Sequence, residues 1–97
     1  MDHKVKIPID GVLDLHTFRP SEVKSLVPYY LKLCRKKGIL NVRIIHGKGT
    51  GTLLRTVHAI LSKLDYVEDF HLAPYQLGGW GATIVRLKPI NKPFKKS

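Results

Sequence analysis

The sequence predicts one α/β domain in which two helices alternate with the strands of a mostly parallel sheet, in the order β-α-β-α-β-β. Three observations lead to this fold class. The 97 residues suffice for a single domain with a modest core. Two segments carry apolar residues at helical spacing, and each follows a short apolar run of strand type. The last two strand-like runs follow each other directly, so they can pair as an antiparallel hairpin, whereas strands joined through helices are parallel.

The first strand is expected at Val12 to Leu15, and it carries Asp14 and His16 near its C-terminal end. Pro20 suits the first position of a helix, where its missing N–H would have no partner. The helix that follows has a one-sided apolar stripe made of Val23, Leu26, Val27, Tyr30, Leu31 and Cys34. Pro28 lies inside this stretch and predicts a bend or a lost backbone hydrogen bond.

The second half repeats the pattern. β-branched residues from Val42 to Ile45 predict a buried strand that glycines terminate. Thr50 or Thr52 can cap the next helix. The buried face of that helix is formed by Leu53, Leu54, Val57, Ile60, Leu61 and Leu64. Two further strands are predicted in "YVEDFHLA" and "ATIVRLK", on either side of the turn "LGGWG".

Charge is the strongest compositional signal. The chain has 17 Lys and Arg against 7 Asp and Glu, a net charge of +10. A small basic domain attracts polyanions through phosphate contacts and counterion release. Cys34 is the only cysteine, which excludes an internal disulfide and a zinc site of several cysteines. No apolar run reaches the roughly 18 residues of a membrane span and no signal peptide is visible, so we expect a cytoplasmic protein without a membrane partner.

The stretch "HGKGTGT" joins the second strand to the second helix. A glycine-rich turn before a helix exposes backbone N–H groups at the positive end of the helix dipole, which favours phosphate. The residues predicted to contact phosphate are Gly47, Lys48, Gly49, Thr50 and Gly51. The spacing fits neither a Walker loop nor G-x-G-x-x-G, so hydrolysis of a nucleoside triphosphate is not indicated. The alternative is a tight turn without a ligand.

His46 directly precedes this turn, where an imidazole could exchange protons with a bound group. The alternative is a histidine that bonds a backbone carbonyl at the end of its strand. Ligands of open α/β sheets gather beyond the C-terminal ends of parallel strands. If the strands ending in "LDLH" and "IIH" are neighbours, Asp14, His16 and His46 converge on one crevice beside the glycine turn.

Acid–base groups beside a phosphate site predict cleavage of a phosphodiester. In RNA the 2′-hydroxyl can be the nucleophile, and no metal is needed. In DNA water must attack, and Asp14 with the histidines could hold a divalent ion such as Mg²⁺ or Mn²⁺. The sequence does not choose between these reactions.

Three ordered motifs resemble the Smr (small MutS-related) domain: "LDLH" at 13–16, "IIHGKGTG" at 44–51 and "GGWGATIVRL" at 78–87. The likeness covers about residues 10–88, with 1–9 as an N-terminal extension and 89–97 as a basic C-terminal tail, and the short chain is similar to stand-alone bacterial members. The resemblance implies a two-layer α/β sandwich on a four-stranded mixed sheet. It also implies nucleic-acid binding with DNA-nicking or RNA-cleaving endonuclease activity.

By position, the resemblance assigns functional roles to Asp14 and His16, to His46, Gly47, Lys48, Gly49 and Gly51, and to Gly79 and Gly81. Thr17 stands where the family has glycine, so the backbone there is expected to run differently and to change the reach of Arg19 into the site. Trp80 either stacks on a base or covers the core. We assign Thr83, His58 and His71 to structural roles and Tyr75 to the core or its margin.

The leading hypothesis is therefore an endonuclease in which Asp14, His16 and His46 are catalytic. Arg19, Gly79, Trp80, Gly81 and the glycine turn would contact nucleic acid. Two rivals remain: a non-catalytic binding module for structured DNA or ribosome-associated RNA, and an adaptor whose charge meets an acidic protein. The expected partners are DNA or RNA, in ribosome or repair complexes.

Overall fold

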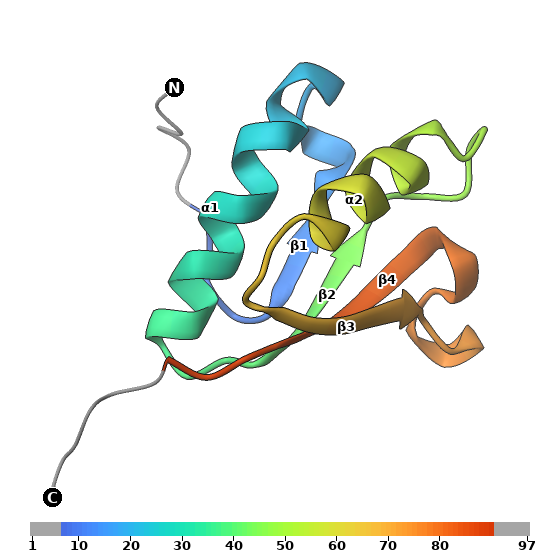
Figure 1. The fold of residues 1–97 in the computed structure, drawn as a ribbon. Coiled ribbons are helices and arrows are strands. Elements are labelled where there is room, and N and C mark those ends of the chain that lie inside the picture. Colours follow the sequence, from blue (N-terminus) through green and yellow to red (C-terminus); the bar gives the residue numbers. More distant parts are fainter. Residues whose placement is uncertain (1–6, 91–97) are drawn as a thin grey trace, which may run out of the picture.

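The computed structural model describes residues 7–90 as a two-layer α/β domain (Figure 1). Its main elements are β1 (Val12–Asp14), α1 (Val23–Lys36), β2 (Asn41–Ile45), α2 (Thr52–Ser62), β3 (Val67–Leu72) and β4 (Ala82–Leu87). Short 3₁₀ turns occupy the connections: η1 (Leu15–Thr17), η2 (Pro20–Glu22), η3 (Tyr75–Leu77) and η4 (Gly79–Gly81). The predicted order β-α-β-α-β-β is confirmed. Most of the expected N-terminal extension and basic tail lies outside the described residues.

The sheet has the strand order β1-β2-β4-β3. β1 pairs parallel with β2, whereas β4 lies between β2 and β3 and is antiparallel to both. The prediction of a mixed four-stranded sheet is confirmed, but the expectation that it is mostly parallel is wrong, because only the β1–β2 pairing is parallel. The reason is the connection between β3 and β4, which is too short for a crossover, so β4 turns back beside β3 and also borders β2.

Both helices pack on one face of the sheet (Figure 1). Leu13, Ile44 and Val85 point from three strands into the core under these helices. Their neighbours along each strand face the other way, because side chains of a strand alternate between the two faces. All six residues of the apolar stripe predicted for α1 are buried. In the described part of the chain, no helix is long and apolar enough to cross a membrane.

Two prolines affect α1 in different ways. Pro20 begins the 3₁₀ turn η2, so the α-helix itself starts three residues later, at Val23. The helix then continues unbroken through Pro28 to Lys36. Of the two effects predicted for Pro28, the lost backbone hydrogen bond follows from its missing N–H, and the buried stripe continues on both sides of it.

The connection between β3 and β4 projects exposed aromatic side chains. Tyr75 is 89% exposed, so its assignment to the core or its margin is wrong. Trp80 is 61% exposed, which excludes the alternative that it covers the core. The connection is held to the sheet by Arg43, whose Nη1 donates to the Leu77 carbonyl over 3.2 Å. The Ala82 side chain lies beneath Gly78, and it is buried there.

Candidate functional site

The three sequence motifs meet at one edge of the sheet. The parallel pairing of β1 with β2 sets Asp14 opposite Ile45, so the end of β1 lies beside the start of the glycine loop, residues 46–51. The third motif joins them through the Gly81 carbonyl, which accepts hydrogen bonds from the N–H groups of His46 at 3.0 Å and Gly47 at 2.8 Å. Residues far apart in sequence therefore form one rim.

Asp14 and His16 form a hydrogen-bonded pair on this rim. The Nδ1 atom of His16 lies 2.6 Å from Asp14 Oδ1, and their side chains are 62% and 53% exposed, respectively. The same carboxylate oxygen accepts from the His16 backbone N–H over 3.0 Å. This backbone bond, followed by the bond with the His16 side chain, lowers the pKa of Asp14, although partial desolvation opposes the shift. The ionised carboxylate can only accept, so His16 Nδ1 carries a proton.

The other ring nitrogen of His16 lies against the glycine loop. A Cβ atom placed on Gly47 would stand only 3.1 Å from His16 Nε2. Gly47 also has φ of +79°, which side chains rarely allow. The structure therefore brings Asp14 and His16 beside the loop, as expected from the sequence.

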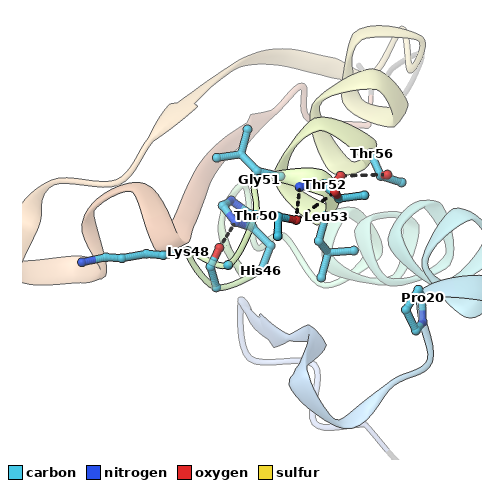
Figure 2. A pocket seen from close by; sticks show the side chains of 11 residues that line it. Pro20, His46, Lys48, Thr50, Gly51, Thr52, Leu53 and Thr56 are labelled. Atoms are coloured by element: carbon cyan, nitrogen blue, oxygen red, sulfur yellow. Dashed lines mark hydrogen bonds between the residues drawn. The ribbon is translucent and has the colours of Figure 1, made fainter.

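The glycine loop presents backbone donors at the start of α2. Within residues 7–90, the N–H groups of Lys48, Gly49 and Thr50 donate to no protein group. The loop, the first turn of α2 and Pro20 line a cavity of about 260 Å³ (Figure 2). Unpartnered amides beside a helix N-terminus suit an anion.

The structure shows which residue caps α2 and where the Lys48 side chain points. The prediction that Thr50 or Thr52 caps α2 is wrong, because Gly51, with φ of +86°, is the N-cap residue. Thr50 Oγ1 accepts only a long hydrogen bond from the Thr52 N–H, at 3.4 Å. The Lys48 side chain is exposed and extends away from the cavity (Figure 2). It passes Gly81, where a Cβ atom would lie 3.3 Å from Lys48 Cγ. Its ammonium group therefore lies on the outer surface and not in the cavity.

The side chain of His46 turns inward from the glycine loop, whereas those of Asp14 and His16 are exposed. The His46 side chain is turned to the core face, as are Val42 and Ile44, and the residue is 5% exposed. Its Nδ1 bonds the Gly47 carbonyl at 3.1 Å, and its Nε2 bonds Thr83 Oγ1 at 2.8 Å. Burial lowers the pKa of His46, and the bond to Gly47 partly opposes this. The expected convergence thus holds for Asp14 and His16, while His46 only borders the cavity (Figure 2).

Thr83 and His58, predicted from the sequence to have structural roles, form a hydrogen-bonded chain with His46. Thr83 Oγ1 also bonds His58 Nε2 at 2.8 Å, and the His58 ring packs edge-on against Phe70 with ring centroids 4.9 Å apart. Burial, and then the neighbouring His46, lowers the pKa of His58. The sequence offers one signal for this contact: His58 adjoins the apolar stripe of its helix.

The remaining predicted contacts lie around the same rim or near it. Arg19 is exposed at the start of η2, and its backbone N–H donates to Glu22 Oε1 over 2.9 Å. Gly79 and Trp80 belong to η4, whose last residue, Gly81, bonds the glycine loop through its carbonyl. Thr17 is accommodated in η1, since no residue other than glycine has a positive φ among the described residues.

Metal-binding side chains are sparse here. No group of three or more His, Cys, Asp or Glu side chains suited to a metal ion occurs within residues 7–90. Asp14 and His16 form a pair of such side chains on the rim, and their facing atoms already bond each other. These residues do not fit a divalent ion held by protein ligands alone.

Comparison with known proteins gives a consistent result. The pattern of the Smr domain family matches residues 13–88. Endonuclease MutS2 of Carboxydothermus hydrogenoformans is 41% identical over 76 residues, which are 78% of this chain and 10% of that protein. Ribosome rescue factor SmrB of Shewanella baltica is 34% identical over 87 residues, which are 90% of this chain and 49% of that protein.

A solved structure agrees with the fold. The crystal structure of the Smr domain of Thermus thermophilus MutS2 has a TM-score of 0.76 and 36% identity, covering 80% of this chain and 98% of that one. The present chain spans about a tenth of the MutS2 relative and about half of the SmrB relative.

Proposed function

Because the chain belongs to the Smr domain family, we propose that it binds a nucleic-acid backbone at the glycine loop and cleaves a phosphodiester with Asp14 and His16. One observation carries the proposal: the exposed His16 bonds Asp14 through Nδ1 and places Nε2 against Gly47. The net charge of +10 favours a polyanionic partner. Relatives named as an endonuclease and as a ribosome rescue factor support the same class of function.

The proposed reaction follows from the different contacts of the two ring nitrogens of His16, Nδ1 and Nε2. Asp14 holds the Nδ1 proton, which leaves Nε2 free to accept a proton at the loop. With RNA, Nε2 takes the proton of the 2′-hydroxyl, the 2′-oxygen forms a bond to phosphorus, and the bond from phosphorus to the 5′-oxygen breaks. The leaving oxygen then takes a proton from water or from the imidazolium. The free amides of Lys48, Gly49 and Thr50 stabilise the charge on the phosphate oxygens.

His46 has a different place in this scheme. Both of its ring nitrogens already bond protein atoms, and the residue is 5% exposed. We therefore assign the proton transfers to His16 and place His46 among the groups that shape the loop.

Replacing His16 tests the proposal most directly. We expect His16→Asn to slow cleavage of RNA or DNA oligonucleotides by about 10²-fold to 10⁴-fold, while salt-sensitive binding stays within about twofold. His71→Asn is the matched control, because His71 is an exposed imidazole on β3. Equal cleavage by wild type and His16→Asn would contradict the assignment and indicate a contaminating nuclease.

The same assay identifies the nucleophile. An RNA substrate with a single 2′-deoxy sugar at the cleavage point should resist cleavage if the 2′-hydroxyl attacks. Assays with a chelator, and with added Mg²⁺ or Mn²⁺, then determine whether a metal takes part. Cleavage of the deoxy substrate would assign the attack to water.

A non-catalytic binding module is the second candidate. It is favoured by the burial of His46, which leaves His16 as the exposed imidazole of the proposed site, whereas acid–base cleavage commonly uses two groups. Such a module would bind structured DNA or ribosome-associated RNA, in ribosome or repair complexes of the cytoplasm. Tight, salt-sensitive binding without cleavage by wild type, with or without metal, would favour it.

A further inference from the structure

A buried chain of hydrogen bonds connects α2, β4 and the glycine loop. Its centre is Thr83, which is fully buried and whose Oγ1 lies 2.8 Å from both His46 Nε2 and His58 Nε2. At the other side of its ring, His46 Nδ1 bonds the Gly47 carbonyl. Phe70 packs edge-on against the ring of His58.

The direction of every bond in this chain follows from the carbonyl at one end together with a neutral His46 ring. The carbonyl of Gly47 can only accept, so His46 Nδ1 carries a proton. Burial keeps the imidazole neutral by lowering the pKa of His46, so its Nε2 holds a lone pair. Thr83 must then donate its single hydroxyl proton to His46, and its oxygen accepts the N–H of His58 Nε2.

The chain ends on the peptide group that opens the loop. The Gly47 carbonyl and the Lys48 N–H belong to one trans peptide, so they point in opposite directions. Holding the carbonyl toward His46 therefore aims the Lys48 N–H away from that ring. This N–H is one of the donors that have no partner within residues 7–90.

We propose that His58 and Thr83 are positioning residues of the nucleic-acid site, which hold His46 as the Nδ1–H tautomer and thereby orient the Gly47–Lys48 peptide toward a phosphate. The inference rests on the proposed function only for the identity of the anion. The tautomers and the orientation of the peptide can be measured without any cleavage. His46, His58 and Thr83 act here through the backbone of the loop rather than on a reacting atom.

The tautomers are read from long-range ¹H–¹⁵N spectra of the uniformly labelled wild-type chain at neutral pH. We expect a protonated Nδ1 with a bare Nε2 for His46, and a protonated Nε2 for His58. A protonated Nε2 on His46, or rapid averaging between its two tautomers, would overturn the inference without recourse to a mutant.

The matched variants Thr83→Val and Thr83→Ser test the effect on the loop. Inorganic phosphate is the probe, and the amide signals of Lys48, Gly49 and Thr50 report its binding. We expect Thr83→Val to let His46 exchange between its two tautomers, because the donor to Nε2 is lost and only the Gly47 carbonyl still favours Nδ1–H. Phosphate binding should weaken about tenfold. Thr83→Ser keeps the hydroxyl and should behave within about twofold of wild type.

A second variant keeps the test decisive if Thr83→Val does not fold. His58→Phe preserves a ring beside Phe70 but removes the donor to Thr83, so the hydroxyl loses its orientation and the His46 signals should broaden between tautomers. Unchanged tautomers and unchanged phosphate affinity in these variants would overturn the inference. Cleavage distinguishes the two proposals: correct tautomers in a wild type that never cleaves would refute the nuclease and leave the positioning role standing.

Discussion

At the scale of single residues, Gly47 is the point where the two imidazoles of the motifs meet. His16 Nε2 lies against the position of its missing Cβ, and His46 Nδ1 bonds its carbonyl. Its own N–H is bound to the Gly81 carbonyl. A residue with a side chain would therefore disturb a catalytic candidate on one side and a buried bond on the other, which gives this glycine a role beyond turning the chain.

Gly47→Ala should separate that role from simple backbone strain. Gly38 has the same φ of +79° but no atom within 4 Å of an added Cβ, so Gly38→Ala is the matched control. Both alanines should cost about 1 kcal/mol or more of stability, measured by urea denaturation, because both are forced into the left-handed region. Only Gly47→Ala should also displace His16 and reduce cleavage. Equal cleavage by both variants would show that cleavage does not depend on the close approach of His16 to Gly47.

The buried His46 and the half-buried His58 predict how stability depends on pH. Burial lowers the pKa of His46 and of His58 in the folded chain, so the unfolded chain binds more protons below the ordinary imidazole value. The free energy of unfolding should therefore fall as pH decreases from about 7 through about 6.5 and on to the lowered folded values. Urea denaturation at several pH values measures this slope.

The variant His58→Phe supplies the control for this prediction. Without His58, one of the two neutral imidazoles is gone, so the slope between about pH 7 and pH 5 should become shallower. The lowered pKa of Asp14 acts in a more acidic window, below the ordinary carboxyl value of 3.8, and does not confound the measurement. A free energy of unfolding that does not change with pH across this interval would contradict the assignment of neutral rings to His46 and His58.

At the scale of elements, the sequence predicts what depends on local pattern. The apolar stripe of α1, the positions of the four strands and the glycine turn all follow from spacing along the chain, and each is present. The neighbouring ends of β1 and β2 follow from the rule for strands joined through a helix. Local spacing and this rule together are enough to predict that Asp14 and His16 lie beside the loop.

The parts that the sequence does not predict depend on contacts between distant segments. The insertion of β4 between β2 and β3 decides that Thr83 faces His46. Those two residues lie 37 positions apart, and Thr83 and His58 lie 25 apart. No local periodicity encodes such a register. The end of β2 just before His46 is predictable from the glycines that follow, whereas the face to which the His46 ring turns depends on alternation within the sheet.

Pro28 offers a test of how α1 tolerates a missing donor. The helix runs unbroken through this residue, but Pro28 cannot donate to the carbonyl one turn earlier. Pro28→Ala should therefore raise stability by about 1 kcal/mol or more, after allowance for the greater entropy of the unfolded chain. Pro20→Ala is the control, since Pro20 begins η2, where a missing N–H has no cost. Thermal unfolding that ranks Pro20→Ala above Pro28→Ala would contradict this view of the helix.

At the scale of the whole molecule, the cations of residues 7–90 include two separate groups. Arg19 and Lys48 are exposed near the rim of the motifs, whereas the cationic cluster at residues 32–37 lies at the end of α1 away from the glycine loop (Figure 1). Part of that cluster already serves the fold. Arg35 Nε donates to the Lys88 carbonyl over 2.9 Å, and its guanidinium lies 4.8 Å from the centroid of the Tyr66 ring. The net charge of +10 therefore overstates the number of cations available to one nucleic-acid segment at the rim.

The salt dependence of binding distinguishes the two cationic regions. Each phosphate neutralised by a cation contributes about −0.7 to −0.9 to the slope of log affinity against log salt concentration. If the rim is the binding surface, Arg19→Ala and Lys48→Ala should each make the slope shallower by about that amount, and Lys36→Ala should leave it unchanged. Fluorescence anisotropy with a labelled oligonucleotide, over about 50 to 200 mM salt, measures the slopes. The opposite pattern, a slope that responds to Lys36 and ignores Arg19 and Lys48, would move the binding surface to the far end of α1 and remove the phosphate from the reach of His16.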